Sequence, residues 1–129
     1  MSSSTKRIDA LWTVVEIRKR LMLDLPQWEL RDNGLWREYK TSGWKSTLMV
    51  VGVIGHFAEI AWHHPDLSVS YAKVGVRITN HDAGGVTGKD FALAIKIDEA
   101  LDWNPATESD SPLQGIPAGS NFDYWDSEN

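Results

Sequence analysis

The sequence predicts an α+β fold in which about three helices cover one face of a four-stranded antiparallel sheet. Asp32-Asn33-Gly34, which is typical of a tight turn, separates two stretches of strand-like composition. Residues 73–79 alternate apolar and polar side chains, as a half-exposed strand does. Apolar residues recur at helical spacing before, between and after these strand pairs. The expected order is therefore helix, two strands, helix, two strands, helix.

The first helix is predicted from Thr5 to Leu23, where apolar side chains recur at helical spacing with charged residues between them. Proline cannot continue a helix, so the helix must end before Pro26. Residues 28–31 and 35–41 then form the two strands of a β-hairpin, because Asn and Gly tolerate the positive φ of the turn between them.

The second helix is predicted to begin after Ser42, whose hydroxyl can cap it. It should stop at about Trp62 or His63, because the residue before a proline disfavours helical geometry. The helix is apolar on more than one stripe of its surface, so it must be buried on several sides. One side is expected to face the sheet, and another a neighbouring helix or a second subunit. Its apolar residues are Trp44, Leu48, Val50, Val51, Val53, Ile54, Phe57 and Ile60.

A third strand and a third helix complete the predicted fold. Val69 and Tyr71 indicate a short strand ahead of the alternating one. Thr87 is expected to cap a last helix that continues to about Leu101.

We predict one domain, residues 1–104, followed by an acidic, disordered tail, residues 105–129. A chain of 129 residues can bury one core but not two. The tail is rich in Ser, Pro, Gly and acids, which cannot bury enough apolar area to offset the entropy of ordering. Residues 122–126 are the exception, because three aromatics among acids can dock on this protein, on an oligomer partner or on a protein client. An exposed cluster without consequence explains the same pattern equally well.

Composition narrows the class of protein. The formal charge of −5 at pH 7 argues against nucleic acid as a partner, although residues from Asp102 onward carry six acids and no Lys or Arg. With no cysteine, disulfide and thiolate chemistry are excluded, which fits a reducing compartment. The apolar run near residues 48–54 is too short to span a membrane, and the N-terminus lacks the apolar region of a signal peptide. A soluble cytoplasmic protein is expected.

Histidine is the residue type that most indicates chemistry. Of the four histidines, His63, His64 and His81 lie at a helix end or in a loop, where side chains can converge on a cleft. An unperturbed pKa of about 6.5 lets one imidazole be protonated while another is neutral. Two such groups on opposite sides of a small molecule can donate and remove a proton in one step, which suits the elimination of water.

Each of these positions also has a structural explanation. Consecutive histidines at a helix end can bond free carbonyls and favour the negative end of the helix dipole. Asp90, three residues after Thr87, can complete a helix cap. Glu59 can be a solvated helix residue, and His56 is expected to be structural.

A metal site is the main alternative to acid–base chemistry. His56, Glu59 and His63 fall at spacings of three and four, so they share one face of the helix. The helix lacks the His-Glu-x-x-His arrangement of metalloproteases, and no cysteine offers a softer ligand. The sequence therefore favours a site without metal.

Taken together, these residues form one spaced pattern. It resembles the signature of the pterin-4a-carbinolamine dehydratases in every specified position and spacing, and the wider similarity covers roughly residues 20–101 but not the tail. An isolated His-His-Pro is common, whereas a match that extends over so many positions is specific. The pattern is Glu59, three residues, His63-His64-Pro65, five residues, Tyr71, nine residues, His81, eight residues, Asp90.

The resemblance implies a hydro-lyase that forms a homodimer or homotetramer. Enzymes of this family dehydrate 4a-hydroxytetrahydropterin to the quinonoid dihydropterin, which regenerates the cofactor of aromatic amino acid hydroxylases. They need no metal or added cofactor. Expelling hydroxide from C4a requires a proton on the leaving oxygen and removal of a proton from the N5 side, so an acid and a base are both needed.

The resemblance implies that His63, His64 and His81 are catalytic. His63 and His81 are expected to be the acid–base pair, with either in either role, while His64 holds the pterin or shares the proton work. Glu59 is expected to orient His63, and Asp90 to support the His81 loop or the pocket. The substrate-binding or supporting residues are Glu59, Pro65, Tyr71 and Asp90.

Two features depart from the family pattern. Asn80 stands where family members commonly have Thr, and an amide can replace the hydroxyl as a hydrogen-bonding group. The acidic, aromatic tail is not part of the usual catalytic domain. Proteins of this fold also act without dehydration, as a dimerisation cofactor of a homeodomain transcription factor or as an assembly factor for RuBisCO. Binding of a protein client through the tail is therefore the alternative function.

Overall fold

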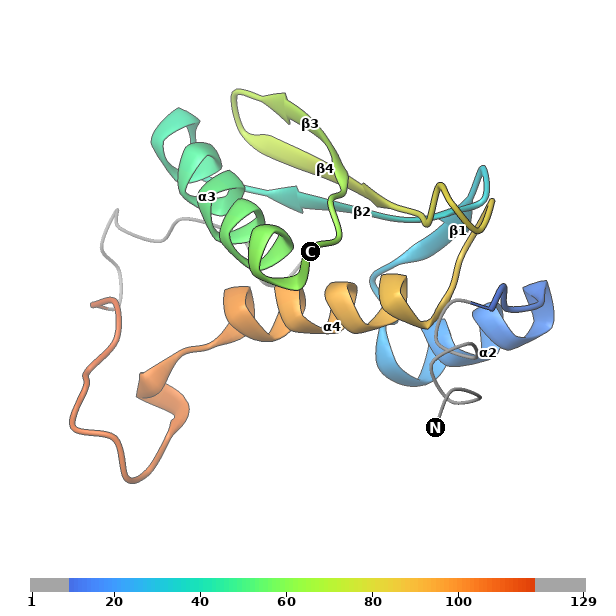
Figure 1. Cartoon of the computed structure of the whole chain (residues 1–129). Helices are drawn as coiled ribbons and strands as arrows, with labels where there is room; N and C mark the ends of the chain where they lie inside the picture. The colour runs from blue at the N-terminus through green and yellow to red at the C-terminus, as the bar shows by residue number, and fades with distance from the viewer. Residues whose placement is uncertain (1–9, 118–129) are drawn as a thin grey trace.

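The computed structural model describes residues 10–117, and it confirms the predicted α+β fold (Figure 1). Four antiparallel strands form one sheet in the order β1-β2-β4-β3, and α3 and α4 lie against the same face of it. The strands are β1 (Glu29–Arg31), β2 (Gly34–Lys40), β3 (Asp66–Ser70) and β4 (Lys73–Ile78). The helices are α2 (Val14–Asp24), α3 (Trp44–Ala61) and α4 (Gly88–Asp102), followed by a short 3₁₀ turn, η1 (Pro105–Thr107).

The first helix begins later than predicted. Thr13 caps α2 in a capping box: its hydroxyl accepts from the Glu16 N–H at 3.1 Å, and Glu16 Oε1 accepts from the Thr13 N–H at 2.8 Å. Ahead of this cap, the backbone N–H of Trp12 donates to the carbonyl of Val86 at 3.0 Å, which holds the segment against the loop before α4. The expected helical residues 5–9 lie outside the described range.

The predicted hairpin is confirmed. Asp32 and Asn33 have φ angles of 50° and 58°, the left-handed geometry that a type I′ turn needs at both central positions. The twist of this turn matches that of the two strands it joins. The next hairpin differs slightly from the prediction, because β3 ends at Ser70 and Tyr71 lies in the turn before β4.

The start of α3 also differs from the prediction, whereas its end agrees. Gly43 occupies the N-cap position and no side chain caps this end, so the expected cap by Ser42 is wrong. The Ser42 hydroxyl instead lies 2.6 Å from the Ser46 hydroxyl. At the other end, α3 stops at Ala61, and Trp62 adopts a left-handed conformation with φ 54°.

The core lies between the sheet and the helices. Val74, Val76 and Ile78 of β4 are completely buried, which confirms the predicted alternation in this strand. Val50 and Ile54 of α3 are also completely buried. Each such side chain contributes roughly 1.5–3 kcal/mol through removal of apolar surface from water. One side of α3 therefore packs as expected, while several of its other apolar residues are exposed.

The end of the chain is described as far as residue 117. Thr87 caps α4 as predicted. Beyond α4, Pro105 is buried at the start of η1, which lies inside the segment predicted as a tail. The aromatic cluster at residues 122–126 lies outside the described residues. No helix between residues 10 and 117 is long and apolar enough to cross a membrane.

One carboxylate on α4 holds the first hairpin in place. Asp98 accepts hydrogen bonds from Trp28 Nε1 at 2.9 Å, from Arg37 Nη1 at 2.8 Å and from the Tyr39 hydroxyl at 2.5 Å. Burial and the negative charge of Asp98 both raise the pKa of Tyr39 above its usual range, because they oppose ionisation of the phenol. The phenol therefore stays a hydrogen-bond donor.

We expect Asp98→Ala to lower the free energy of unfolding by about 3 kcal/mol, because a buried guanidinium loses one charged acceptor and two other donors each lose one hydrogen bond. Urea unfolding followed by tryptophan fluorescence measures the change. Glu99→Ala is the matched control, since Glu99 is exposed and pairs with Lys96 at 3.3 Å on the helix surface. Equal unfolding midpoints for the two variants would contradict the prediction.

Candidate active site

His63 and Asp90 form a hydrogen-bonded pair that joins the end of α3 to the start of α4. His63 Nε2 lies 2.6 Å from Asp90 Oδ1. The Asp90 side chain is completely buried, and that of His63 is 16% exposed. Because Trp62 turns the chain out of the helix, the following imidazole can reach α4 rather than continue along α3. The pair is thus held by packing on one side and open to solvent on the other.

The two oxygens of Asp90 have different partners. Oδ2 accepts from the Thr87 backbone N–H at 2.7 Å, which completes the capping box of α4. Oδ1 faces His63, so Asp90 can cap α4 and contact the histidine at the same time. A carboxylate, when ionised, can only accept hydrogen bonds, so in that state the hydrogen of this contact is carried by His63 Nε2. That Asp90 supports the His81 loop or the pocket stays a prediction.

Glu59 pairs with His64 rather than with His63. Its Oε1 lies 2.9 Å from His64 Nε2, and both side chains are more than half exposed. The prediction that Glu59 orients His63 is therefore wrong. A pair spaced by four residues needs both members within one helix, but α3 ends at Ala61 and the left-handed Trp62 redirects the chain.

His81 lies in the loop between β4 and α4 and is exposed. Within residues 10–117, no hydrogen bond or ion pair of its side chain is found. The base of its loop is fixed, because the backbone of Asn80 bridges to that of Gly85, with an N–H to carbonyl distance of 2.9 Å. That His63, His64 and His81 line one cleft stays a prediction.

Two of the supporting residues occupy different surroundings. Pro65 is half-buried and directly follows His63 and His64 in the sequence. Tyr71 is 70% exposed at the opposite end of α3, where its carbonyl accepts from the Thr47 hydroxyl at 2.9 Å. An 18-residue helix is about 27 Å long. Within one chain, Tyr71 therefore lies far from His63, and the sequence pattern does not reflect contact between them.

Sequence reasoning missed the contacts of Asn80, which is buried. Its Oδ1 accepts from the Ala83 N–H at 3.1 Å, and its Nδ2 lies 3.5 Å from the Thr87 hydroxyl. An Asn placed directly after a buried strand and before a Gly-Gly loop is typical of such a turn, and this pattern could have indicated the first contact. The second depends on the start of α4 and is not visible in the sequence.

The three side chains considered for a metal site do not gather. Glu59 turns to His64, His63 turns to Asp90, and His56 lies edge-on to Phe57 with ring centroids 5.2 Å apart. In the described part of the chain, no group of three or more histidine and acidic side chains is placed to hold a metal ion.

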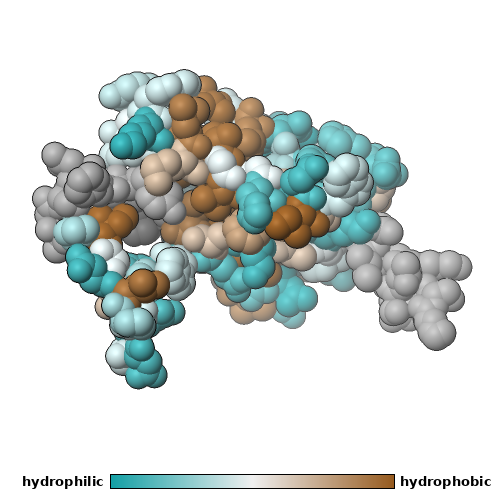
Figure 2. Space-filling model, turned by 60° about the vertical axis from the view of Figure 1, so that its left-hand side comes forward, coloured by the Kyte–Doolittle hydropathy of each residue, from teal (hydrophilic) through white to brown (hydrophobic). Residues whose placement is uncertain are grey.

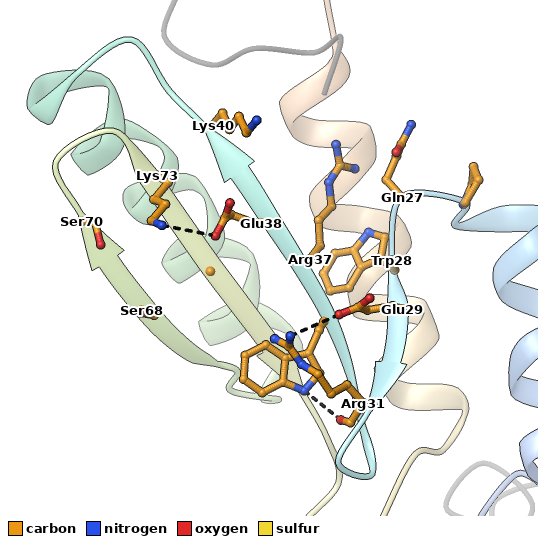
Figure 3. A pocket seen from close by; sticks show the side chains of 13 residues that line it. Gln27, Trp28, Glu29, Arg31, Arg37, Glu38, Lys40, Ser68, Ser70 and Lys73 are labelled. Atoms are coloured by element: carbon orange, nitrogen blue, oxygen red, sulfur yellow. Dashed lines mark hydrogen bonds and ion pairs between the residues drawn. The ribbon is translucent and has the colours of Figure 1, made fainter.

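A groove of about 690 Å³ crosses the face of the sheet turned away from α3, and none of the predicted site residues lines it (Figure 3). Its charges are largely paired: Lys73 lies 3.9 Å from Glu38, and Arg31 lies 3.4 Å from Glu29. Arg31 also stacks over Trp36 at 4.0 Å. This groove is a polar, salt-bridged sheet surface, separate from the histidines.

Comparison with known proteins identifies the family. The family model described as "Pterin 4 alpha carbinolamine dehydratase" matches residues 10–100, which includes all the site residues predicted above. The chain belongs to the pterin-4a-carbinolamine dehydratase family. The resemblance inferred from the spacing between Glu59 and Asp90 is thereby confirmed, and the matched range stops before η1 and the predicted tail.

Two curated relatives and one solved structure illustrate how similar this chain is to other members of the family. A protein of Aquifex aeolicus named "Putative pterin-4-alpha-carbinolamine dehydratase" is 47% identical over 83 residues, covering 64% of this chain and 84% of the relative. A protein of the same name from Roseiflexus castenholzii is 39% identical over 92 residues, covering 71% and 98%. The crystal structure of a "transcriptional coactivator/pterin dehydratase" from Brucella melitensis has a TM-score of 0.63 and 25% identity, covering 67% of this chain and 94% of that one.

The hydrogen bond to Asp90 predicts the tautomer of His63. At a pH where imidazoles are neutral, we expect His63 to carry its hydrogen on Nε2, and Asp90→Ala to remove this preference. Heteronuclear NMR of the imidazole nitrogens distinguishes the tautomers. His64, which pairs with Glu59, is the internal control and should not change. A His63 signal that is the same in both proteins would show that Asp90 does not set the tautomer.

Proposed function

We propose that the chain dehydrates 4a-hydroxytetrahydropterin to the quinonoid dihydropterin by histidine acid–base catalysis, and so recycles a pterin cofactor in the cytoplasm. The pairing of His63 with the buried Asp90 is the observation that carries this proposal. It gives one partly exposed imidazole a fixed tautomer and a free Nδ1. Membership of the dehydratase family and the absence of cysteine support the reaction and the compartment.

The reaction needs two proton transfers on one flat heterocycle. One of His63 and His81 protonates the 4a-hydroxyl, which leaves as water with the electrons of the C4a–O bond. The other removes the N5 proton, and the N5 lone pair forms the double bond to C4a, so atoms and charge balance. Each positioned proton donor or acceptor typically contributes about 10²- to 10⁴-fold in rate. No metal or added cofactor takes part in this scheme.

Asp90 acts on the reaction through His63. When His63 accepts a proton at Nδ1, the carboxylate 2.6 Å from Nε2 stabilises the imidazolium that forms. His64 and Glu59, which form an exposed pair, bind the pterin edge or share the proton work in this proposal. Because these side chains face solvent, their pair can rearrange around a ligand at little cost.

The turnover of the dehydration tests the proposal directly. We expect His63→Ala and His81→Ala each to lower kcat by about tenfold or more, because each removes one proton carrier. Ultraviolet absorbance follows the dehydration of freshly generated 4a-hydroxytetrahydropterin, and circular dichroism checks the fold. His56→Gln is the control, since His56 is exposed and lies outside the pair. Turnover unchanged in both alanine variants would end the acid–base assignment.

A binding role is the second candidate function. The solved relative from Brucella melitensis is described as a transcriptional coactivator as well as a pterin dehydratase, which favours a protein partner for some members of this fold. In that case the chain is a catalytically silent assembly chaperone or dimerisation cofactor, with the tail as a contact for its client. Wild-type turnover no faster than that of the His63→Ala, His81→Ala double variant would favour this role.

We infer that the chain assembles into a homodimer or homotetramer through α3. Apolar side chains gather on the side of the molecule where α3 lies (Figure 2). Trp44, Leu48 and Met49 are each about half exposed. Gly52 and Gly55 leave open space on the same helix, so a second helix can approach closely there. A second copy of α3 would remove this apolar surface from water.

Sedimentation velocity tests this assembly. We expect the double variant Leu48→Glu, Met49→Glu to sediment as a monomer, because buried carboxylates without partners oppose association. Lys19→Glu, an exposed charge reversal on α2, is the control and should keep the wild-type sedimentation coefficient. A wild-type protein that is itself monomeric at micromolar concentration would contradict the inference.

A further inference from the structure

We propose that Asn80 is a positioning residue that couples the His81 loop to the His63–Asp90 pair. The proposal deepens the proposed function and rests on it, because it concerns the same two histidines. No hydrogen bond between Asn80 and His63 is found within residues 10–117. Asn80 acts through a chain of contacts that leads from the loop to the start of α4.

The backbone of Asn80 closes the loop that carries His81. Its N–H donates to the Gly85 carbonyl at 2.9 Å, and its carbonyl accepts from the N–H groups of Gly84 and Gly85 at 2.9 and 3.2 Å. Its side-chain Oδ1 accepts from the Ala83 N–H at 3.1 Å. Four hydrogen bonds thus fix the residue directly before His81, so the orientation of this histidine depends on Asn80.

The far end of the loop is clamped by the segment before α2. The Trp12 N–H donates to the Val86 carbonyl, and the Trp12 ring stacks on Phe91 of α4 with centroids 4.6 Å apart. At Gly85, an added Cβ would lie 3.0 Å from Leu11 Cδ2, so the backbone there is closely packed. The freedom of the loop is therefore confined to its tip, which contains His81.

The amide nitrogen of Asn80 connects the loop to the histidine pair. Nδ2 lies 3.5 Å from the Thr87 hydroxyl, and that hydroxyl lies 3.5 Å from Asp90 Oδ2. Donors and acceptors run in one direction, from the amide N–H to the hydroxyl oxygen and from the hydroxyl hydrogen to the carboxylate. The other oxygen of Asp90 holds His63. Asn80 is thus three contacts away from the imidazole.

An amide suits position 80 because it offers a hydrogen-bond acceptor and a hydrogen-bond donor on one side chain. The oxygen accepts from the loop, and the nitrogen donates toward Thr87. A threonine at position 80 has one side-chain oxygen and cannot place it at both points. The Asn80–Thr87 and Thr87–Asp90 side-chain contacts, each 3.5 Å, are the longest steps of this series. The contacts of Asp90 with the Thr87 N–H and with His63 are 2.7 and 2.6 Å. A change at Asn80 should therefore shift Asp90 without breaking its pair with His63.

The experiment combines a spectroscopic readout with a double-mutant cycle in the full chain. In Asn80→Ala, we expect the His63 imidazole nitrogen signals to shift and kcat to fall by about tenfold, with KM changed less than about twofold. In the Asp90→Asn background, Asn80→Ala should leave the His63 signals where Asp90→Asn alone puts them, because the effect of Asn80 on His63 passes through this carboxylate. Asp82→Asn, an exposed change in the same loop, is the control for both readouts.

The outcomes separate a positioning role from loop closure alone. If Asn80→Ala leaves the His63 signals unchanged, or if it shifts them by the same amount in the Asp90→Asn background, the proposal is overturned. Asn80→Asp keeps an acceptor for Ala83 but loses the donor to Thr87, so it tests the coupling even if the alanine variant is poorly folded. The NMR measurement needs no turnover, so it tests the coupling between Asn80 and His63 even if the proposed dehydration is not found.

Discussion

A buried carboxylate needs hydrogen-bond partners for its oxygens, and in Asp90 this requirement joins two parts of the chain. One oxygen caps the start of α4 and the other holds His63 beyond the end of α3. At the start of α4, burial without such a group would leave the backbone N–H of Thr87 without its hydrogen-bond acceptor. The carboxylate that caps α4 therefore also holds the imidazole of His63.

The helix α4 serves as the common support of the hairpin and the site. Asp90 lies in its first turn, and Asp98 lies eight residues further on, about 12 Å along the axis. Asp98 binds three donors of the β1 and β2 region, while Asp90 binds His63. Both carboxylates belong to one helix, so the hairpin and His63 are anchored to the same element.

The helix α3 has two apolar sides with different uses. One side carries Val50 and Ile54 into the core, and the other leaves Trp44, Leu48 and Met49 partly exposed. Among the elements between residues 10 and 117, α3 packs against α4, β3 and β4, and its second side stays partly exposed. The packing of α3 within residues 10–117 thus explains only part of the apolar excess seen in the sequence of this helix, and the proposed self-association would explain the rest.

The sequence by itself determined the elements and the family. The turn at Asp32-Asn33, the alternation of β4 and the Thr87 cap depend on neighbouring residues, so local patterns suffice to predict them. Only the tertiary structure decided which carboxylate meets which histidine. Helical spacing placed Glu59 beside His63, but the left-handed Trp62 turns that imidazole toward Asp90, which is 27 residues away in the chain. Contacts of this kind depend on how α3 and α4 cross, and no local pattern records that.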